Sequence, residues 1–248
     1  ASRLSAPQPH EGQRWIDIRE IERGDDNRRI KTATVPVPCT HCREPECARA
    51  ATSGAVYVRE DGAVIIDPKK AVGQRQIAEA CPIGAVYWNE ELNLPQKCTL
   101  CAELLDEGFR APRCVDACPN GAMHFGDLDD QNSEVCRLIA ENRVTPLPEL
   151  NGTETNVIHL NVPTVFFSGS VYLPEDEVAD GGEVTLTDLK TGETRSVTTN
   201  CFGDWEFEWL EKDARYEVRI SLPGWRTVTL EAVADTDHFL GEVTLEKA

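Results

Sequence analysis

The sequence predicts an α+β protein made of a cysteine-rich module over residues 1–126, a helix and linker over 127–163, and a small β-sandwich over 164–248. Two observations predict this division. Eight of the ten cysteines lie between Cys39 and Cys118, at short and repeated spacings. From residue 164 onward the apolar residues recur with a period of two, and Gly-containing turns separate the runs, as in a β-sandwich. A chain of 248 residues is long enough for two such domains.

The composition excludes several classes of function. The chain carries 25 Lys and Arg against 43 Asp and Glu, a net charge of −18, which argues against nucleic acid or an anionic membrane surface as its main partner. No apolar run approaches the roughly 20 residues that cross a bilayer, and residues 1–13 contain no apolar core of a secretory signal. No Ser/His/Asp set, phosphate-binding loop or dinucleotide fingerprint is present, so the sequence offers no catalytic residues of its own.

The first cysteine group resembles the pattern of bacterial ferredoxins, C-x2-C-x2-C-x3-C-P, in which the fourth cysteine of each motif ligates the cluster of the other motif. Cys39, Cys42 and Cys47 supply three thiolates, with a slightly longer last spacing. Three segments that begin at positions 51, 81 and 118 share Gly-Ala three and four residues later, and Ala51 stands where the other two have cysteine. By the crossover rule, Cys81 completes the first set, so these four cysteines are predicted to hold one 4Fe-4S cluster.

The partner motif of this first group has lost every ligand. At the standard spacing its positions are Ala71, Gln74 and Ile77, and its fourth ligand would be Ala51. Complete loss of one set beside complete retention of the other indicates a two-cluster module reduced to one cluster. We expect Gln74 and Ile77 to fill the space that the lost cluster occupied.

The second group consists of Cys98, Cys101, Cys114 and Cys118, and Cys118 is followed by proline. By the crossover rule the first three hold one cluster and Cys118 completes another. No partner motif lies between residues 1 and 38. Either these four cysteines close one cluster among themselves, or the partner motif precedes Ala1. The chain itself is therefore expected to support two 4Fe-4S clusters.

Structural zinc and disulfides are the alternatives to iron–sulfur ligation. Pairs of C-x2-C also begin all-cysteine zinc sites, but zinc spacing does not account for repeated Cys-Pro segments or crossover ligands. A disulfide-bonded secreted protein would spread its cysteines through the whole fold. His41 and His124 lie beside the cysteines, and we expect them to surround the ligands or to lie at the surface. Cys136 and Cys201 have no partners in the motifs and are expected to be ordinary thiols.

A helix is predicted over residues 132–141, with Ser133 as its N-cap, and residues 149–162 are predicted to form a linker. Strands are predicted from the alternating runs at 166–172, 183–187, 205–209, 216–220, 226–230 and 241–245. Trp205, Phe207 and Trp209 alternate with glutamates, so they share one face of their strand. This aromatic row is either a ligand platform or part of the sandwich core, and the inward-facing rule for strands favours the core.

Three segments resemble the iron–sulfur subunits of the dimethyl sulfoxide reductase family: CTHCREPEC at 39–47, VREDGAVIID at 58–67 and CTLC at 98–101. Further features are similar to the branch of that family whose enzymes transfer or remove hydroxyl groups on polyhydroxylated aromatic compounds, as catechol dehydroxylases do. These features are Arg14-Trp15, the lost motif at 71–77, the segment VYWNEE at 86–91 and the added C-terminal sandwich.

The resemblance implies an electron-transfer subunit that docks on a large catalytic subunit containing a molybdenum or tungsten bis-pterin cofactor. It implies a transthyretin-like or carboxypeptidase regulatory-like sandwich, and a third cluster if an N-terminal four-cysteine motif precedes Ala1. Free thiolates and the lack of a signal favour the cytoplasm, with export alongside a signal-bearing partner as the alternative. A zinc-stabilised, non-redox binding module with an adhesive sandwich is the competing hypothesis.

Overall fold

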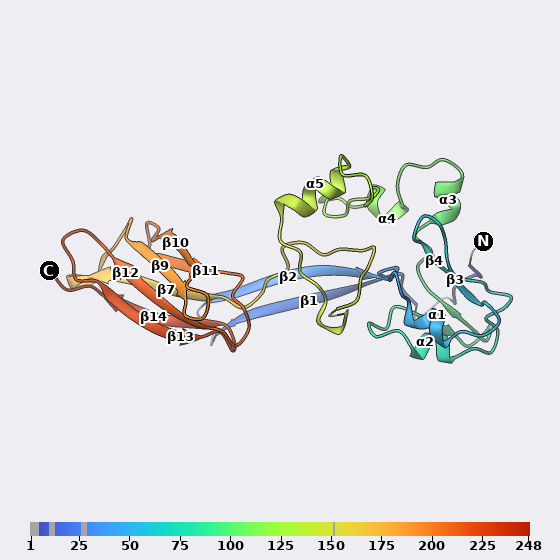
Figure 1. Cartoon of the computed structure of the whole chain (residues 1–248), viewed down its shortest axis with the longest axis horizontal. Coiled ribbons are helices and arrows are strands. Elements are labelled where there is room, and N and C mark those ends of the chain that lie inside the picture. Colours follow the sequence, from blue (N-terminus) through green and yellow to red (C-terminus); the bar gives the residue numbers. More distant parts are fainter. Residues whose placement is uncertain (1–4, 10–12, 26–28, 151) are drawn as a thin grey trace. The chain divides into compact units, whose positions relative to one another are not determined.

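The computed structural model describes residues 5–9, 13–25, 29–150 and 152–248. It forms two compact units (Figure 1). The cysteine unit comprises Ala1–Arg19 and Val35–Val162, and the sheet unit comprises Glu20–Thr34 and Pro163–Ala248. The paired strands β1 (Ile16–Asp25) and β2 (Arg29–Pro38) therefore contribute residues to both units. No secondary structure was predicted for this segment from the sequence.

The cysteine unit consists of short elements joined by tight turns. Two hairpins organise it, one formed by β3 and β4 and the other by β5 and β6, both antiparallel. Helices α1 and α2 lie side by side (Figure 1). The elements are α1 (Glu46–Ala50), β3 (Val56–Val58), β4 (Val64–Ile66), α2 (Gln76–Glu79), β5 (Tyr87–Asn89), β6 (Leu94–Gln96), α3 (Ala102–Asp106), α4 (Arg113–Asp116), α5 (Glu134–Glu141) and the 3-10 turn Pro148–Leu150.

Helix α5 confirms the predicted helix and its cap. The Ser133 side chain accepts a hydrogen bond from the Cys136 backbone N–H at 3.3 Å, which satisfies one of the free N–H groups at the helix start. The helix begins at Glu134, two residues later than predicted. Helix ends fray, and their assignment commonly differs by one or two residues. Within the described residues, no helix combines the length and the apolar character that crossing a bilayer demands.

The segment after α5 returns to the cysteine loop instead of running free. The Arg43 N–H donates to the Glu154 carbonyl at 3.0 Å, and the N–H groups of Asn156 and Val157 donate to the Thr40 carbonyl at 3.0 and 3.2 Å. Residues 149–162, predicted as a linker, are therefore hydrogen-bonded to the loop that carries the first cysteine group. Backbone hydrogen bonds to a partner far away in sequence leave no signature in local composition.

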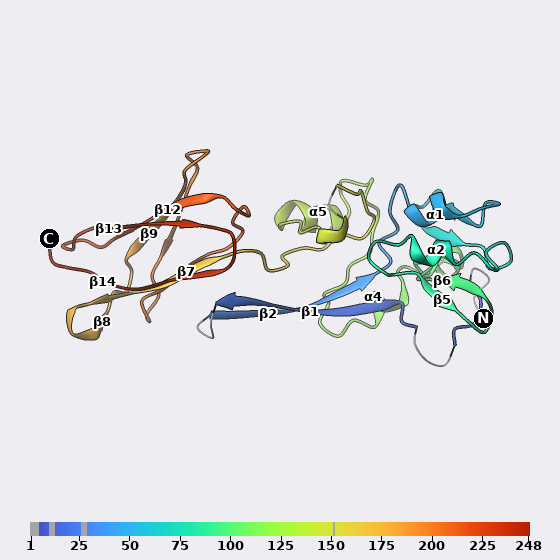
Figure 2. The same cartoon turned by 90° about the horizontal axis from the view of Figure 1, so that it is seen from below.

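Two sheets make up the sheet unit. One has the order β10-β9-β12-β13, and the other has the order β11-β7-β14 with β8 beside β7. Figure 2 shows β9, β12 and β13 in one layer and β7, β8 and β14 in the other. Strands β7 and β14 are parallel, and the other pairs are antiparallel. The strands are β7 (Phe167–Leu173), β8 (Glu177–Val178), β9 (Glu183–Asp188), β10 (Thr194–Thr198), β11 (Asp204–Phe207), β12 (Arg215–Ser221), β13 (Val228–Val233) and β14 (His238–Thr244), and the 3-10 turn Pro174–Asp176 follows β7.

The aromatic row belongs to the core between the two sheets, as the inward-facing rule predicted. Trp205 and Phe207 are each only 3% exposed and pack among buried residues of both sheets. A Cβ atom on Gly169 would lie 2.7 Å from the Trp205 ring, so glycine is required opposite this indole. The predicted strand is wrong at its end: β11 stops at Phe207, and Trp209 has a φ of +61°, which is incompatible with strand geometry.

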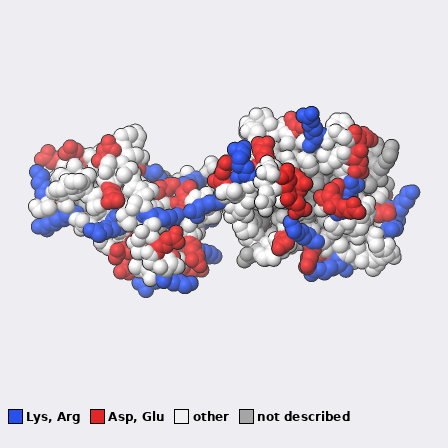
Figure 3. Space-filling model, turned by 45° about the horizontal axis from the view of Figure 1, so that its top comes forward, with Lys and Arg blue, Asp and Glu red and all other residues white. Residues whose placement is uncertain are grey.

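Basic side chains of strands β1 and β2 pair with acidic side chains of the sheet unit. The Lys31 ammonium contacts Glu206 and Glu208, the outward-facing residues that alternate with Trp205 and Phe207. Arg29 pairs with Asp204, and Arg23 pairs at 3.0 Å with Asp237, which is 5% exposed. On the face drawn in Figure 3, acidic and basic residues are interspersed over both units. The carboxylates of β11 are therefore partly neutralised within the chain itself.

Candidate metal centre

The first predicted ligand set is brought together around the start of α1 and the end of α2. Cys39 and Cys47 are buried, at 9% and 8% exposure, and Cys42 and Cys81 are half-buried. Burial raises the pKa of the Cys47 thiol to about 11, and nearby Cys39, Cys81 and Cys42 add to this rise because thiolates repel one another. Cys81 also packs against the apolar cluster that contains Cys47, so the structure brings Cys81 close to the first three cysteines.

The repeated segments form the same sulfur-binding turn twice. The Ala85 N–H donates to the Cys81 sulfur at 3.3 Å, and the Ala122 N–H donates to the Cys118 sulfur at 3.3 Å. In both copies the preceding glycine has a positive φ, +66° at Gly84 and +60° at Gly121, which glycine adopts without strain. The repeated Gly-Ala therefore has a structural role. The glycine adopts the positive φ of the turn, and the alanine N–H donates to the cysteine sulfur four residues earlier.

The third copy retains the turn but has lost the sulfur. Gly54 has a φ of +63°, and Ala51 takes the place of the cysteine. The other positions of the lost motif are occupied by packed side chains. Ala71 and Ile77 are both 0% exposed within the core of the cysteine unit. The Gln74 side chain accepts from the Thr52 N–H at 2.8 Å and donates to the Lys70 carbonyl at 2.8 Å.

The second predicted set forms a connected series. Burial raises the pKa of the Cys98 thiol to about 11, and neighbouring Cys39 and Cys101 contribute. Burial also raises the pKa of Cys114, with contributions from Cys101 and Cys118. The N–H of Ala122 lowers the pKa of the half-buried Cys118. Electrostatic effects therefore link each thiol of this set to another thiol of the set, and Cys39 of the first set also acts on Cys98.

The loop between Cys98 and Cys101 is wound tightly by two left-handed residues. Leu100 and Cys101 have φ values of +57° and +52°, and helix α3 starts directly after them. The Leu100 N–H donates to the Cys98 sulfur at 3.3 Å. Left-handed backbone in non-glycine residues is uncommon and is found at functional sites. Cys136 is half-buried and Cys201 is exposed, and none of the ten cysteines is in a disulfide.

His41 is a buried group whose role the sequence did not reveal. It is 0% exposed, and its Nδ1 accepts a hydrogen bond from the Val64 N–H at 2.9 Å. Burial, together with nearby Lys97, holds the pKa of His41 well below its ordinary value. A neutral imidazole that accepts at Nδ1 carries its proton at Nε2. That Nε2 is buried without a hydrogen-bond partner among the described residues.

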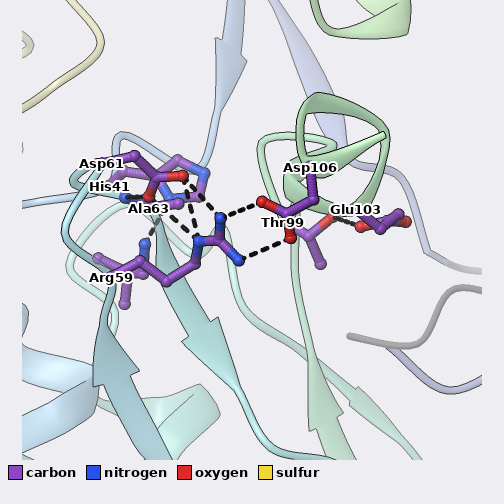
Figure 4. Close-up of polar contacts among 8 residues, drawn as sticks. His41, Arg59, Asp61, Ala63, Thr99, Glu103 and Asp106 are labelled. Carbon is purple, nitrogen blue, oxygen red and sulfur yellow. Dashed lines mark hydrogen bonds and ion pairs between the residues drawn. The ribbon is translucent and has the colours of Figure 1, made fainter. Parts of the chain in front are cut away.

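An arginine clamp fixes helix α3 to the hairpin turn between β3 and β4 (Figure 4). Arg59 donates to Asp106 of α3 at 2.6 and 3.1 Å, and to Asp61 of the turn at 2.9 Å and longer. Such a bidentate arrangement constrains geometry as well as adding attraction. Because α3 follows Cys101 directly, the clamp holds the second cysteine set against the hairpin whose strand β4 contacts His41.

We expect the Arg59→Met variant to show faster hydrogen exchange of the backbone amides of α3 at neutral pH. Burial would raise the pKa of Asp61, but the hydrogen bonds from Arg59 and from the Ala63 N–H outweigh it, and Arg59 also lowers the pKa of Asp106 below its ordinary value. Lowered native pKa values mean that the clamp stabilises fully above pH 3.8 and weakens as pH falls through the native values. Anaerobic hydrogen exchange of residues 102–106 should therefore differ between wild type and variant at pH 7, and converge at lower pH.

Arg137→Met serves as the control, since Arg137 forms only an exposed pair with Glu141 at 3.6 Å. Equal protection of α3 in wild type and Arg59→Met at pH 7 would contradict the clamp.

The surroundings of the sulfurs fit an iron–sulfur cluster. Among the described residues, no three His, Cys, Asp or Glu side chains converge on the position of a single ion. Backbone N–H groups point at the sulfurs of Cys81, Cys98 and Cys118. The buried Nε2–H of His41 has no acceptor among the described residues and would be satisfied by an electron-rich cluster sulfur.

Comparison with known proteins agrees with this chemistry. The 4Fe-4S dicluster domain family matches residues 30–128. The pyrogallol hydroxytransferase small subunit of Pelobacter acidigallici is 35% identical over 243 residues, 94% of this chain and 85% of that protein. A subunit of the tetrathionate reductase of Salmonella typhimurium is 32% identical over 61% of this chain and 60% of its own length. A subunit of the anaerobic dimethyl sulfoxide reductase of Escherichia coli is 37% identical over 49% and 58%.

The fold and the cysteine sets define an iron–sulfur electron-transfer subunit of an oxidoreductase. This protein belongs to the family of iron–sulfur subunits that includes the pyrogallol hydroxytransferase small subunit, and it binds 4Fe-4S clusters. This confirms the family predicted from the cysteine motifs. The competing hypothesis, a zinc-stabilised binding module without redox function, finds no support among these relatives.

Proposed function

We propose that this chain relays single electrons for a large catalytic subunit with a molybdenum or tungsten bis-pterin cofactor. The partner's reaction would be the removal or transfer of a hydroxyl group on a polyhydroxylated aromatic compound. The similarity to the pyrogallol hydroxytransferase small subunit, which spans nearly the whole chain, supports this proposal. When bound, the clusters supply one-electron transfer. The chain's own residues position the thiolates, donate hydrogen bonds to the sulfurs and bury them from water.

The ligand assignment is part of this proposal. Cys39, Cys42, Cys47 and Cys81 hold the first cluster, which the mutual effect on the Cys47 thiol supports. Cys98, Cys101 and Cys114 hold the second. Cys118 closes the second cluster, unless a four-cysteine motif precedes Ala1, in which case Cys118 serves a third cluster by the crossover rule. About eight iron atoms per chain in the native complex would support two clusters, and about twelve would support three.

The sheet unit is proposed to be a transthyretin-like or carboxypeptidase regulatory-like sandwich that docks the large subunit. Two sheets with one shared core support a sandwich. Its docking role is tested by deleting residues 163–248 from the expressed complex and measuring whether the large subunit still co-purifies. Unchanged co-purification would reject the docking role.

The electron-transfer function is tested on the native complex, purified without oxygen. We expect a brown protein with broad absorption near roughly 400 nm, acid-labile sulfide, and a co-purifying large subunit that contains molybdenum or tungsten. Dithionite should bleach the absorption, and an added polyhydroxylated aromatic substrate should restore it if the partner is a reductive dehydroxylase. Colourless protein with stoichiometric zinc would overturn the proposal.

A further inference from the structure

Lys97 is a buried lysine of the cysteine unit. It follows strand β6 directly and precedes Cys98, and it is only 3% exposed. Lysine is almost never fully buried unless it is paired, because removing an ammonium from water costs several kcal/mol. A lysine buried to this degree is therefore expected to have a counter-charge.

The contacts of Lys97 include no carboxylate. Its ammonium donates to two backbone carbonyls, that of Val64 and, at 3.0 Å, that of Cys98. In the described part of the chain, no Asp or Glu forms an ion pair with it. Lys31 provides the contrast, because its half-buried ammonium contacts the carboxylates of both Glu206 and Glu208. Carbonyl oxygens satisfy two of the three N–H donors of Lys97, but among the described residues no carboxylate offsets its charge.

Lys97 contacts the loop of the second cysteine set directly and is connected to the loop of the first set through Val64 of strand β4. Its own backbone continues into Cys98 of the second set, whose carbonyl it also binds. The connection to the first set runs through Val64. The Val64 carbonyl accepts a hydrogen bond from the Lys97 ammonium, and the Val64 N–H donates one to His41. His41 lies between the ligands Cys39 and Cys42 in the sequence. Hydrogen bonds therefore join Lys97 directly to the second set, and through Val64 and His41 to the first.

We propose that Lys97 is a shared counter-charge for the two iron–sulfur clusters, which raises the reduction potential of both. The inference rests on the proposed ligand sets. A reduced cluster carries one more negative charge than an oxidised one, and a cation in a low-dielectric interior stabilises that charge more strongly than it would in water. With a net charge of −18 the chain as a whole disfavours reduction, so a cation beside both clusters keeps both reducible. Lys97 is a positioning residue for charge and not a ligand.

The test is a redox titration of the intact complex, followed by electron paramagnetic resonance, in wild type, Lys97→Met and Lys97→Arg. Lys97→Met retains the length of the side chain and removes its charge, whereas Lys97→Arg retains the charge. In Lys97→Met we expect the equilibrium constant for one-electron reduction to fall at least tenfold at both clusters. This lowers each reduction potential by at least about 59 mV. In Lys97→Arg we expect potentials close to wild type. Lys69→Met, at an exposed lysine of the same unit, is the control and should change neither.

Iron content separates this inference from the ligand assignment. Full iron with unchanged potentials in Lys97→Met would overturn the counter-charge, while leaving the ligand sets intact. A fall at one cluster alone would overturn the shared role. If Lys97→Met loses iron but Lys97→Arg keeps it, the charge is needed to hold the clusters, which supports the proposal. Loss of iron in both variants would show that lysine packing, and not charge, matters, and would overturn it.

Discussion

The Cys81→Ala variant is expected to be isolated with about four fewer iron atoms per chain than wild type. Cys81 lies 42 positions after Cys39 in sequence, yet its sulfur is among the groups that raise the pKa of Cys47. Removing one thiolate leaves three ligands for a cluster that needs four, so the whole cluster should be lost. Iron and acid-labile sulfide, measured after anaerobic purification of the complex, provide the readout.

Cys201→Ala is the matched control for this loss. Cys201 is an exposed free thiol in the sheet unit and belongs to neither ligand set. Its replacement should leave iron content unchanged, which separates loss of a ligand from loss of any cysteine. Full iron content in Cys81→Ala would refute the crossover pairing and, with it, the explanation of Ala51 as the remnant of a lost ligand set.

The Ile77→Ala variant is expected to keep its iron but to lose about 2–5 kcal/mol of unfolding free energy in the cysteine unit. Ile77 is 0% exposed and packs with Val56, Val64 and Ile66. Truncating Ile77 loses the favourable free energy of burying the removed methyl and methylene groups. It also leaves a cavity, because the neighbouring side chains relax only partly. Native-state hydrogen exchange of strands β3 and β4 measures the change in free energy without requiring reversible unfolding.

Val72→Ala controls for the loss of apolar side-chain atoms, since Val72 is 53% exposed and should change stability by less than about 0.5 kcal/mol. The same packing predicts that cysteines placed together at positions 51, 71, 74 and 77 will not add a cluster. If the restored set did bind about four further iron atoms, the space would not be filled in the way that the side chains of Ile77 and Gln74 indicate.

Much of the candidate site could be predicted from one sequence because binding a cluster through cysteines constrains the spacing of residues that are close together in the chain. The spacing of Cys39, Cys42 and Cys47, the repeated Gly-Ala and the missing cysteine at Ala51 are all visible as residue types at fixed offsets. Period-two alternation likewise predicted that Trp205 and Phe207 face a core. It could not predict that Trp209 leaves the strand with a left-handed φ, since that conformation depends on the turn that follows.

The sequence by itself determined the cluster-binding chemistry, the family and the presence of strands in the C-terminal region, because thiolate spacing and hydrophobic period are local properties of the chain. Only the tertiary structure decided which side chains surround the sulfurs. Burial of Lys97 and His41, and their meeting at Val64, depend on contacts between segments 23 to 56 positions apart. Electrostatic environment is set by what packs nearby in space, and a lone Lys or His in a sequence carries no mark of it.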